Sequence, residues 1–181
     1  MNDNILIEIF ARPLGTGAFL RLLAWCRDLG ATEFTLDVQG TNMDPRELWH
    51  RVQTILAPFE CGEAERDRPT GYEIWTRESV PLYALSAESI DALATTGITV
   101  HFEPQKSPKY TRTEDGLNSD PYQHPHFLCL YRDQEPLLWL DEEQDVRVYL
   151  DLSPDELRLL LAAQLVPERQ YVLSDTHGNR L

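Results

Sequence analysis

Alternation of apolar and polar residues predicts the strands of this chain, and apolar residues three and four positions apart predict its helices. Residues 5–10 alternate around three isoleucines and are expected to form the first strand. Residues 16–29 carry an apolar stripe at helical spacing and end at Gly30, a residue suited to the left-handed conformation that closes helices. Residues 33–39 alternate again and predict the second strand.

Capping sequences mark the start of three further helices. Asp44-Pro45-Arg46-Glu47 and Ser153-Pro154-Asp155-Glu156 each place a capping side chain before a proline, followed by a glutamate that reaches back to the cap amide. Ser86 is expected to cap the third of these helices, which Gly97 closes. Among the remaining residues, 72–76 and 98–102 are predicted to be strands, and the polar residues 60–71 are predicted to be a loop.

The last third of the chain predicts an antiparallel meander. Residues 127–132, 137–140 and 146–152 are predicted strands separated by short polar turns, and residues 171–173 predict a short terminal strand. Before the meander lies a polar stretch, residues 104–125, with four prolines and no hydrophobic period. Loops of this length are uncommon unless they are functional or mobile, so we interpret the stretch either as a lid or as a free arm.

These elements predict an α+β fold with a mixed sheet of about six to seven strands. The N-terminal half has the order of βαβ units, the C-terminal half is the antiparallel meander, and the helices are expected mainly on one face. We expect a single domain over residues 1–181. A sub-structure of residues 1–103 and 126–181, joined by the long loop 104–125, is the alternative. The chain is long enough to bury a core without disulfides.

Charge narrows the classes of function. The 181 residues include 30 acidic and 16 basic ones, which gives a net charge of −14. We therefore expect neither direct nucleic-acid binding, which relies on lysines and arginines, nor binding to an anionic membrane. No apolar run is long enough to span a bilayer, and the N-terminus lacks the basic lead of a signal peptide. Cys26, Cys61 and Cys129 match no disulfide or zinc pattern, so a reducing, cytoplasmic location is expected.

Negative charge gathers near the C-terminus. Residues 133–156 hold nine carboxylates and one arginine, a net of −8 out of the total of −14. This clustering favours a non-enzymatic domain that binds a basic partner protein, such as an inhibitor or an antitoxin-like neutraliser. The candidate partner-binding residues are Asp133, Glu135, Asp141, Glu142, Glu143 and Asp145, with Trp139 as an aromatic anchor. The competing interpretation is that acidic turns only solvate the molecule and keep strand edges from pairing.

Four residues support an alternative function, a small metal-binding protein or metal-dependent enzyme beneath the 104–125 loop. His101 and Glu103 are two residues apart in a predicted strand, and His124 and His126 have the same spacing at the end of the loop. If the two segments meet, three imidazoles and a carboxylate would suit a divalent transition metal. The favoured binding function needs no cofactor. The chain has no Gly-x-Ser-x-Gly nucleophile motif, and Gly15-Thr16-Gly17 lacks the third glycine of a dinucleotide fingerprint, so no catalytic residue is assigned.

Overall fold

The computed structural model of the chain describes residues 4–10, 14–40, 45–71, 74–96, 112–113, 116–117, 123–141, 147–167, 171–175 and 179–181. The described helices are α2 (Thr16–Asp28), α3 (Pro45–Leu56), the 3₁₀ turn η1 (Ala57–Phe59), α4 (Ala87–Thr95) and α5 (Pro154–Ala162). The described strands are β1 (Ile5–Phe10), β2 (Glu33–Gly40), β3 (Glu60–Gly71), β4 (Ile74–Ala84), β5 (Arg112–Thr113), β6 (Gly116–Leu117), β7 (Gln123–Arg132), β8 (Glu135–Asp141), β9 (Arg147–Leu152) and β10 (Tyr171–Ser174).

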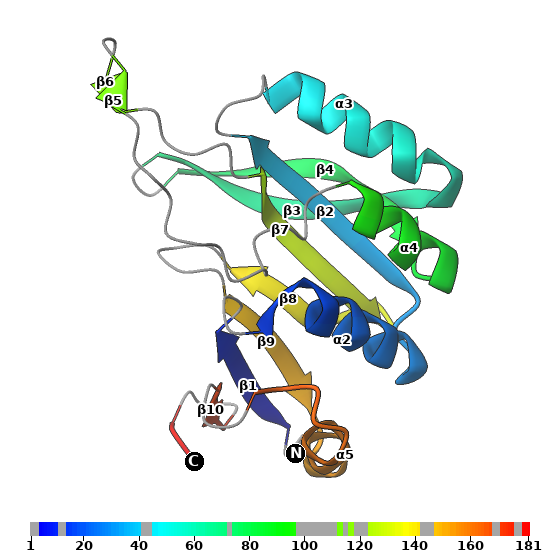
Figure 1. Cartoon of the computed structure of the whole chain (residues 1–181), viewed down its shortest axis with the longest axis vertical. Coiled ribbons are helices and arrows are strands. Elements are labelled where there is room, and N and C mark those ends of the chain that lie inside the picture. Colours follow the sequence, from blue (N-terminus) through cyan, green and yellow to red (C-terminus); the bar gives the residue numbers. More distant parts are fainter. Residues whose placement is uncertain are drawn as a thin grey trace.

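Eight of the described strands form one sheet in the order β10-β1-β9-β8-β7-β2-β4-β3 (Figure 1). Every described pairing in this sheet is antiparallel. The α+β class and the C-terminal meander are confirmed, and among the described strands the sheet is antiparallel rather than mixed. Four antiparallel steps separate β1 from β2, so the two strands run in the same direction across α2. The meander β9-β8-β7 lies between them, and this insertion converts a βαβ order into an antiparallel sheet.

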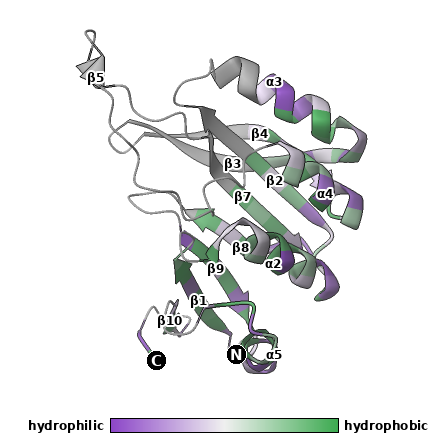
Figure 2. Cartoon of the chain, in the orientation of Figure 1, coloured by the Kyte–Doolittle hydropathy of each residue, from purple (hydrophilic) through white to green (hydrophobic). Residues whose placement is uncertain are grey.

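One row of apolar side chains forms the centre of the core. Ile7, Leu150, Leu138, Leu130 and Phe34 are successive register partners across β1, β9, β8, β7 and β2. None of these five side chains is more than 1% exposed. Helices α2, α3 and α4 lie on this face, as expected (Figure 1). Figure 2 shows apolar residues where the helices meet the central strands, and α2 contributes its predicted buried stripe of Phe19, Leu22, Leu23 and Cys26.

The neighbouring row of residues points to the opposite side of the sheet, which we call the far face. It runs through Glu8, Tyr149, Trp139, Cys129 and Thr35, again as successive register partners. Helices α2, α3 and α4 do not cover this face, because they lie on the other side of the sheet (Figure 1). Alternation along each strand therefore separates apolar core residues from a row that is rich in polar and aromatic groups.

The predicted loop at residues 60–71 is wrong, because these residues form strand β3. They pair with β4 over most of their length, and β4 itself extends well beyond the predicted strand at 72–76. β3 lies at the edge of the sheet, where charged residues keep a strand from pairing with other chains. An edge strand of this kind has no apolar face for the sequence to reveal, and the additional strand raises the count to eight.

Two other predictions of secondary structure are only partly described. The strand predicted at 98–102 and its preceding Gly97 lie outside the described residues. Within the predicted loop 104–125, β5 and β6 form a separate two-stranded ribbon, and β7 begins at Gln123. The rest of that stretch lies outside the described residues, so both interpretations of it, as a lid and as a free arm, stay predictions.

The buried row predicts a large effect of core truncation. Leu138 is fully buried between β7 and β9, so Leu138→Ala should lower the free energy of unfolding by about 2–5 kcal/mol through lost transfer energy and a residual cavity. Leu159 on α5 is 58% exposed, and Leu159→Ala should change the free energy of unfolding by less than about 1 kcal/mol. Urea denaturation followed by circular dichroism measures both. Equal losses would contradict the proposed position of the core.

Candidate functional site

A tight hairpin places two of the predicted acidic residues at one end of the sheet. Arg132 pairs with Glu135, and the two residues between them, Asp133 and Gln134, both have positive φ, at 52° and 69°. Two consecutive residues of this kind form the type I′ turn, whose twist matches that of the flanking strands. Asp133 and Glu135 are both exposed at the end of this hairpin.

A β-bulge beyond the turn decides where the indole of Trp139 lies. Leu130 pairs with Leu138, but Tyr131 pairs with Pro136, so Leu137 is an extra residue in β8. The bulge lets Leu137 and Leu138 both be buried, at 1% and 0% exposure. Trp139 then falls on the far face, where its ring stacks on Tyr149 of β9 with centroids 5.6 Å apart and planes 14° apart.

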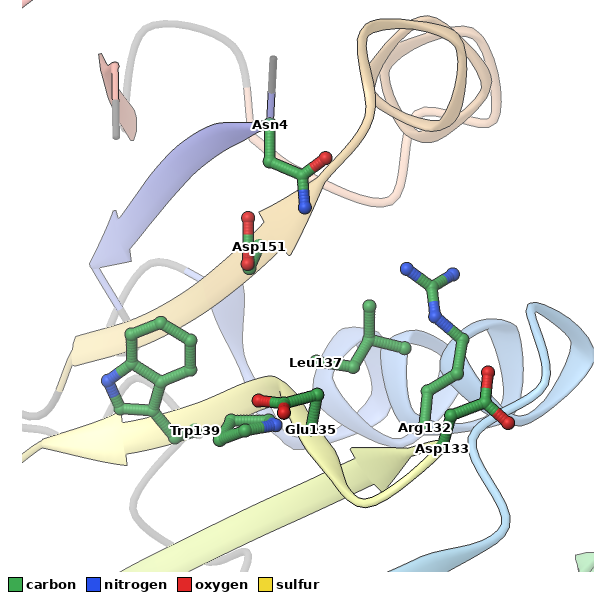
Figure 3. A pocket seen from close by; sticks show the side chains of 8 residues that line it. Asn4, Arg132, Asp133, Glu135, Leu137, Trp139 and Asp151 are labelled. Carbon is green, nitrogen blue, oxygen red and sulfur yellow. The ribbon is translucent and has the colours of Figure 1, made fainter. Parts of the chain in front are cut away.

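A hollow of about 530 Å³ lies beside this stack, between the hairpin, the end of β9 and the start of β1. Its walls are Asn4, Arg132, Asp133, Glu135, Pro136, Leu137, Trp139 and Asp151. Figure 3 shows Trp139 at one end and Arg132 with Asp133 at the other, with Leu137 between them. The volume falls within the range of about 300–1,000 Å³ that is usual for ligand pockets.

The charges around the hollow are unbalanced. Asp133, Glu135 and Asp151 contribute three carboxylates, and within the described part of the chain none of them has an ion pair or a side-chain hydrogen bond. Arg132 is the cation of the lining, but its guanidinium Nη1 donates to Glu156 Oε1 at 2.5 Å. Because that ion pair compensates Arg132, the lining retains an excess of negative charge.

Glu156 connects this site to the start of α5. Its carboxylate accepts hydrogen bonds from the Ser153 amide and hydroxyl, and the Ser153 hydroxyl accepts one from the Glu156 amide. This capping box confirms the predicted helix start at Ser153. Burial acts to raise the pKa of Glu156, but the hydrogen bonds from Arg132 and Ser153 outweigh it and hold the pKa below its usual value. The carboxylate is therefore charged at neutral pH and available to Arg132.

An arginine on the far face, Arg147, shows how this surface holds a cation. Arg147 of β9 donates to Glu8 of β1 at 2.5 Å, and its guanidinium carbon lies 5.4 Å from the centroid of the Phe10 ring. The charge of Glu8 is the main cause that raises the pKa of Arg147 above its ordinary value. A carboxylate and an aromatic ring thus hold one guanidinium between them.

The structure brings together three of the predicted partner-binding residues, Asp133, Glu135 and Trp139, in one hollow. Asp141 ends β8, six residues from Glu135 and therefore about 20 Å away along the strand, and its side chain is not described. Glu142, Glu143 and Asp145 lie outside the described residues. Of the three carboxylates in the lining, Asp151 is the one that was not a candidate from the sequence, although its alternation with Tyr149 along β9 places both on one face.

The predicted metal ligands are not brought together by any described contact. His101 and Glu103 lie outside the described residues, and only the backbone of His124 and His126 is described, within β7. Val38 pairs with Pro125 and Asp37 with Phe127, so a bulge at His126 interrupts the alternation that the paired-imidazole hypothesis assumes. Among the described residues, no three His, Cys, Asp or Glu side chains are grouped as a metal site requires.

Comparison with protein-family models, curated proteins and solved structures found no match to this chain. None of the described helices is long and apolar enough to cross a membrane. The site must therefore be interpreted from its own geometry, which combines an aromatic ring, three carboxylates and a hollow large enough for a side chain.

The low pKa of Glu156 predicts a pH dependence of stability. The Glu156 carboxylate binds a proton more readily in the unfolded chain than in the folded one. Its contribution to the free energy of unfolding is therefore fully present above the unfolded pKa of about 4.3, and it is lost as pH falls through the folded pKa. Glu156→Gln should lower the free energy of unfolding by about 1–2 kcal/mol at neutral pH and much less in acid. Urea denaturation of both proteins between acid and neutral pH measures this loss. An equal loss of unfolding free energy at every pH would contradict the low pKa assigned to Glu156.

The three thiols should differ in reactivity. Cys26 and Cys129 are buried, as predicted, and burial raises the pKa of both thiols, that of Cys129 to about 11. Cys61 is exposed on β3, but partial burial and the nearby Glu33 and Glu60 raise its pKa. Iodoacetamide at neutral pH should modify Cys61 slowly and the other two only after denaturation, as mass spectrometry would show. Rapid labelling of Cys26 in the folded protein would contradict its placement.

Proposed function

We propose that this protein is a non-enzymatic binding protein that docks a basic surface of another protein onto the hollow beside Trp139. The observation that carries this proposal is the set of three carboxylates without a cationic partner in the described chain, arranged around an aromatic wall. Aromatic residues within a polar rim are typical of the energetically important centres of protein interfaces.

The net charge of −14 supports the same partner class. A surface of one sign raises the encounter rate with a partner of opposite sign and disfavours partners of like sign. Proteins that bind nucleic acids present clustered lysines and arginines, so an acidic inhibitor of a nucleic-acid-directed enzyme is the class that this surface suits best. No cofactor is required for this function.

The test compares charge reversal in the hollow with the same reversal elsewhere. Asp133→Lys with Glu135→Lys should slow association with immobilised core histones, used as a basic protein probe, by about tenfold at low salt, and less as salt rises. Surface plasmon resonance gives the association rates.

The matched control is Glu60→Lys with Asp91→Lys. Both residues are exposed, and Glu60 lies on β3, four strands away from β8 in the sheet. The control changes the net charge by the same amount, so it should slow association by no more than about twofold if position matters as well as charge. Equal slowing by the two double variants would show that only net charge attracts the probe and would refute the proposed site.

A further inference from the structure

We infer that the hollow receives an arginine side chain of the partner, with its guanidinium between the Trp139 ring and the carboxylates of Glu135 and Asp151. This inference rests on the proposed function, since it names the group of the basic partner that enters the site. It is drawn from the shape and chemistry of the hollow together with a cation that the far face already holds.

The far face offers a direct precedent for the proposed contact. Arg147 lies between the Phe10 ring and the Glu8 carboxylate, two groups that β1 presents on the same side of the sheet. Trp139 and Asp151 repeat this combination of ring and carboxylate around the hollow, with Glu135 as a second acceptor. In the described part of the chain no cation lies within ion-pair distance of these carboxylates.

The indole is held in place before any partner arrives. Tyr149 stacks against it from the neighbouring strand, while Trp139 still lines the hollow. A ring that is already positioned loses little conformational freedom on binding, which favours affinity. Trp also gives the strongest cation–π interaction of the aromatic side chains.

Arg132 leaves room for a second cation. It lies at the opposite end of the hollow from Trp139 (Figure 3), and Glu156 compensates its charge. Leu137 lies between the two ends (Figure 3) but is almost fully buried. The exposed Pro136 gives the lining an apolar surface, against which the methylene stem of an entering side chain can pack. The carboxylates proposed to bind the entering cation are thus separate from the ion pair between Arg132 and Glu156 at the start of α5.

Arginine fits this arrangement better than lysine. A guanidinium is planar, so it stacks on a ring while its edge donates to carboxylates, often in a bidentate manner. An ammonium group is a compact and strongly hydrated point charge that cannot do both in the same way. The hollow should therefore distinguish the two cations, although both carry the same charge.

The test follows the indole N–H resonance of Trp139 by NMR, assigned through its loss in Trp139→Phe. Titration with N-acetyl-arginine amide should shift this resonance with saturation at millimolar concentrations, as expected for one small contact. The matched probe is N-acetyl-citrulline amide, which has nearly the same shape without the charge, and it should cause no saturable shift. N-acetyl-lysine amide should bind at least about threefold more weakly than the arginine probe.

Variants locate the contact. Asp151→Asn with Glu135→Gln removes two charges with little change of shape and should weaken arginine binding at least about fivefold. The control double variant, Glu60→Gln with Asp91→Asn, should leave the affinity for the arginine probe unchanged. An equal shift with citrulline, no shift with arginine, or full binding by the first double variant would each overturn the inference. The citrulline comparison uses the unaltered chain, so it holds even if a variant fails to fold.

The two experiments distinguish a wrong arginine pocket from a wrong binding function. One outcome is that histone association depends on Asp133 and Glu135 while N-acetyl-arginine amide leaves the indole resonance of Trp139 unshifted. In that case the proposed binding surface is supported and the arginine pocket is wrong. If association does not depend on these carboxylates, the proposed function fails whatever the arginine titration shows.

Discussion

Burial of one apolar row across the centre of the sheet is the constraint on which the site depends. Because side chains alternate along a strand, fixing Leu138 and Leu150 in the core places Trp139 and Tyr149 together on the far face. A slip of one residue would exchange the two rows and place the indole in the core. The bulge at Leu137 is part of the same constraint, since it adjusts the register between the hairpin turn and Leu138.

The ion pair between Arg132 and Glu156 links the hairpin to α5 and also sets the charge of the hollow. Glu156 has two roles, because it closes the capping box with Ser153 and it compensates the arginine at the end of β7. A hollow with this arginine uncompensated would be closer to neutral and less attractive to a cation. Packing of the helix start and electrostatics of the far face are therefore coupled through one carboxylate.

The described carboxylates of the acidic segment, residues 133–156, do not all lie at the same end of the sheet. Residues 133–156 are consecutive in the sequence, but Asp133 in the hairpin turn and Glu135 at the start of β8 lie at one end of the sheet, and Asp141 at the end of β8 lies at the other. Asp151 returns to the first end because β9 is antiparallel to β8. The antiparallel hairpin thus selects which carboxylates meet, and it joins residues that the charge count alone treats as equivalent.

Local sequence determined much of this protein. The strand at Ile5–Phe10, the helix ending before Gly30, the helix caps at Ser86 and Ser153 and the C-terminal meander all follow from period, caps and turns, which act over a few residues. Three kinds of feature needed the tertiary structure. The edge strand β3 is recognisable only from its pairing with β4, and the insertion of the meander between β1 and β2 is a long-range choice. The hollow exists only because Asp151, Trp139 and the hairpin turn are brought together across strands, since pairing partners far apart in sequence leave no local pattern.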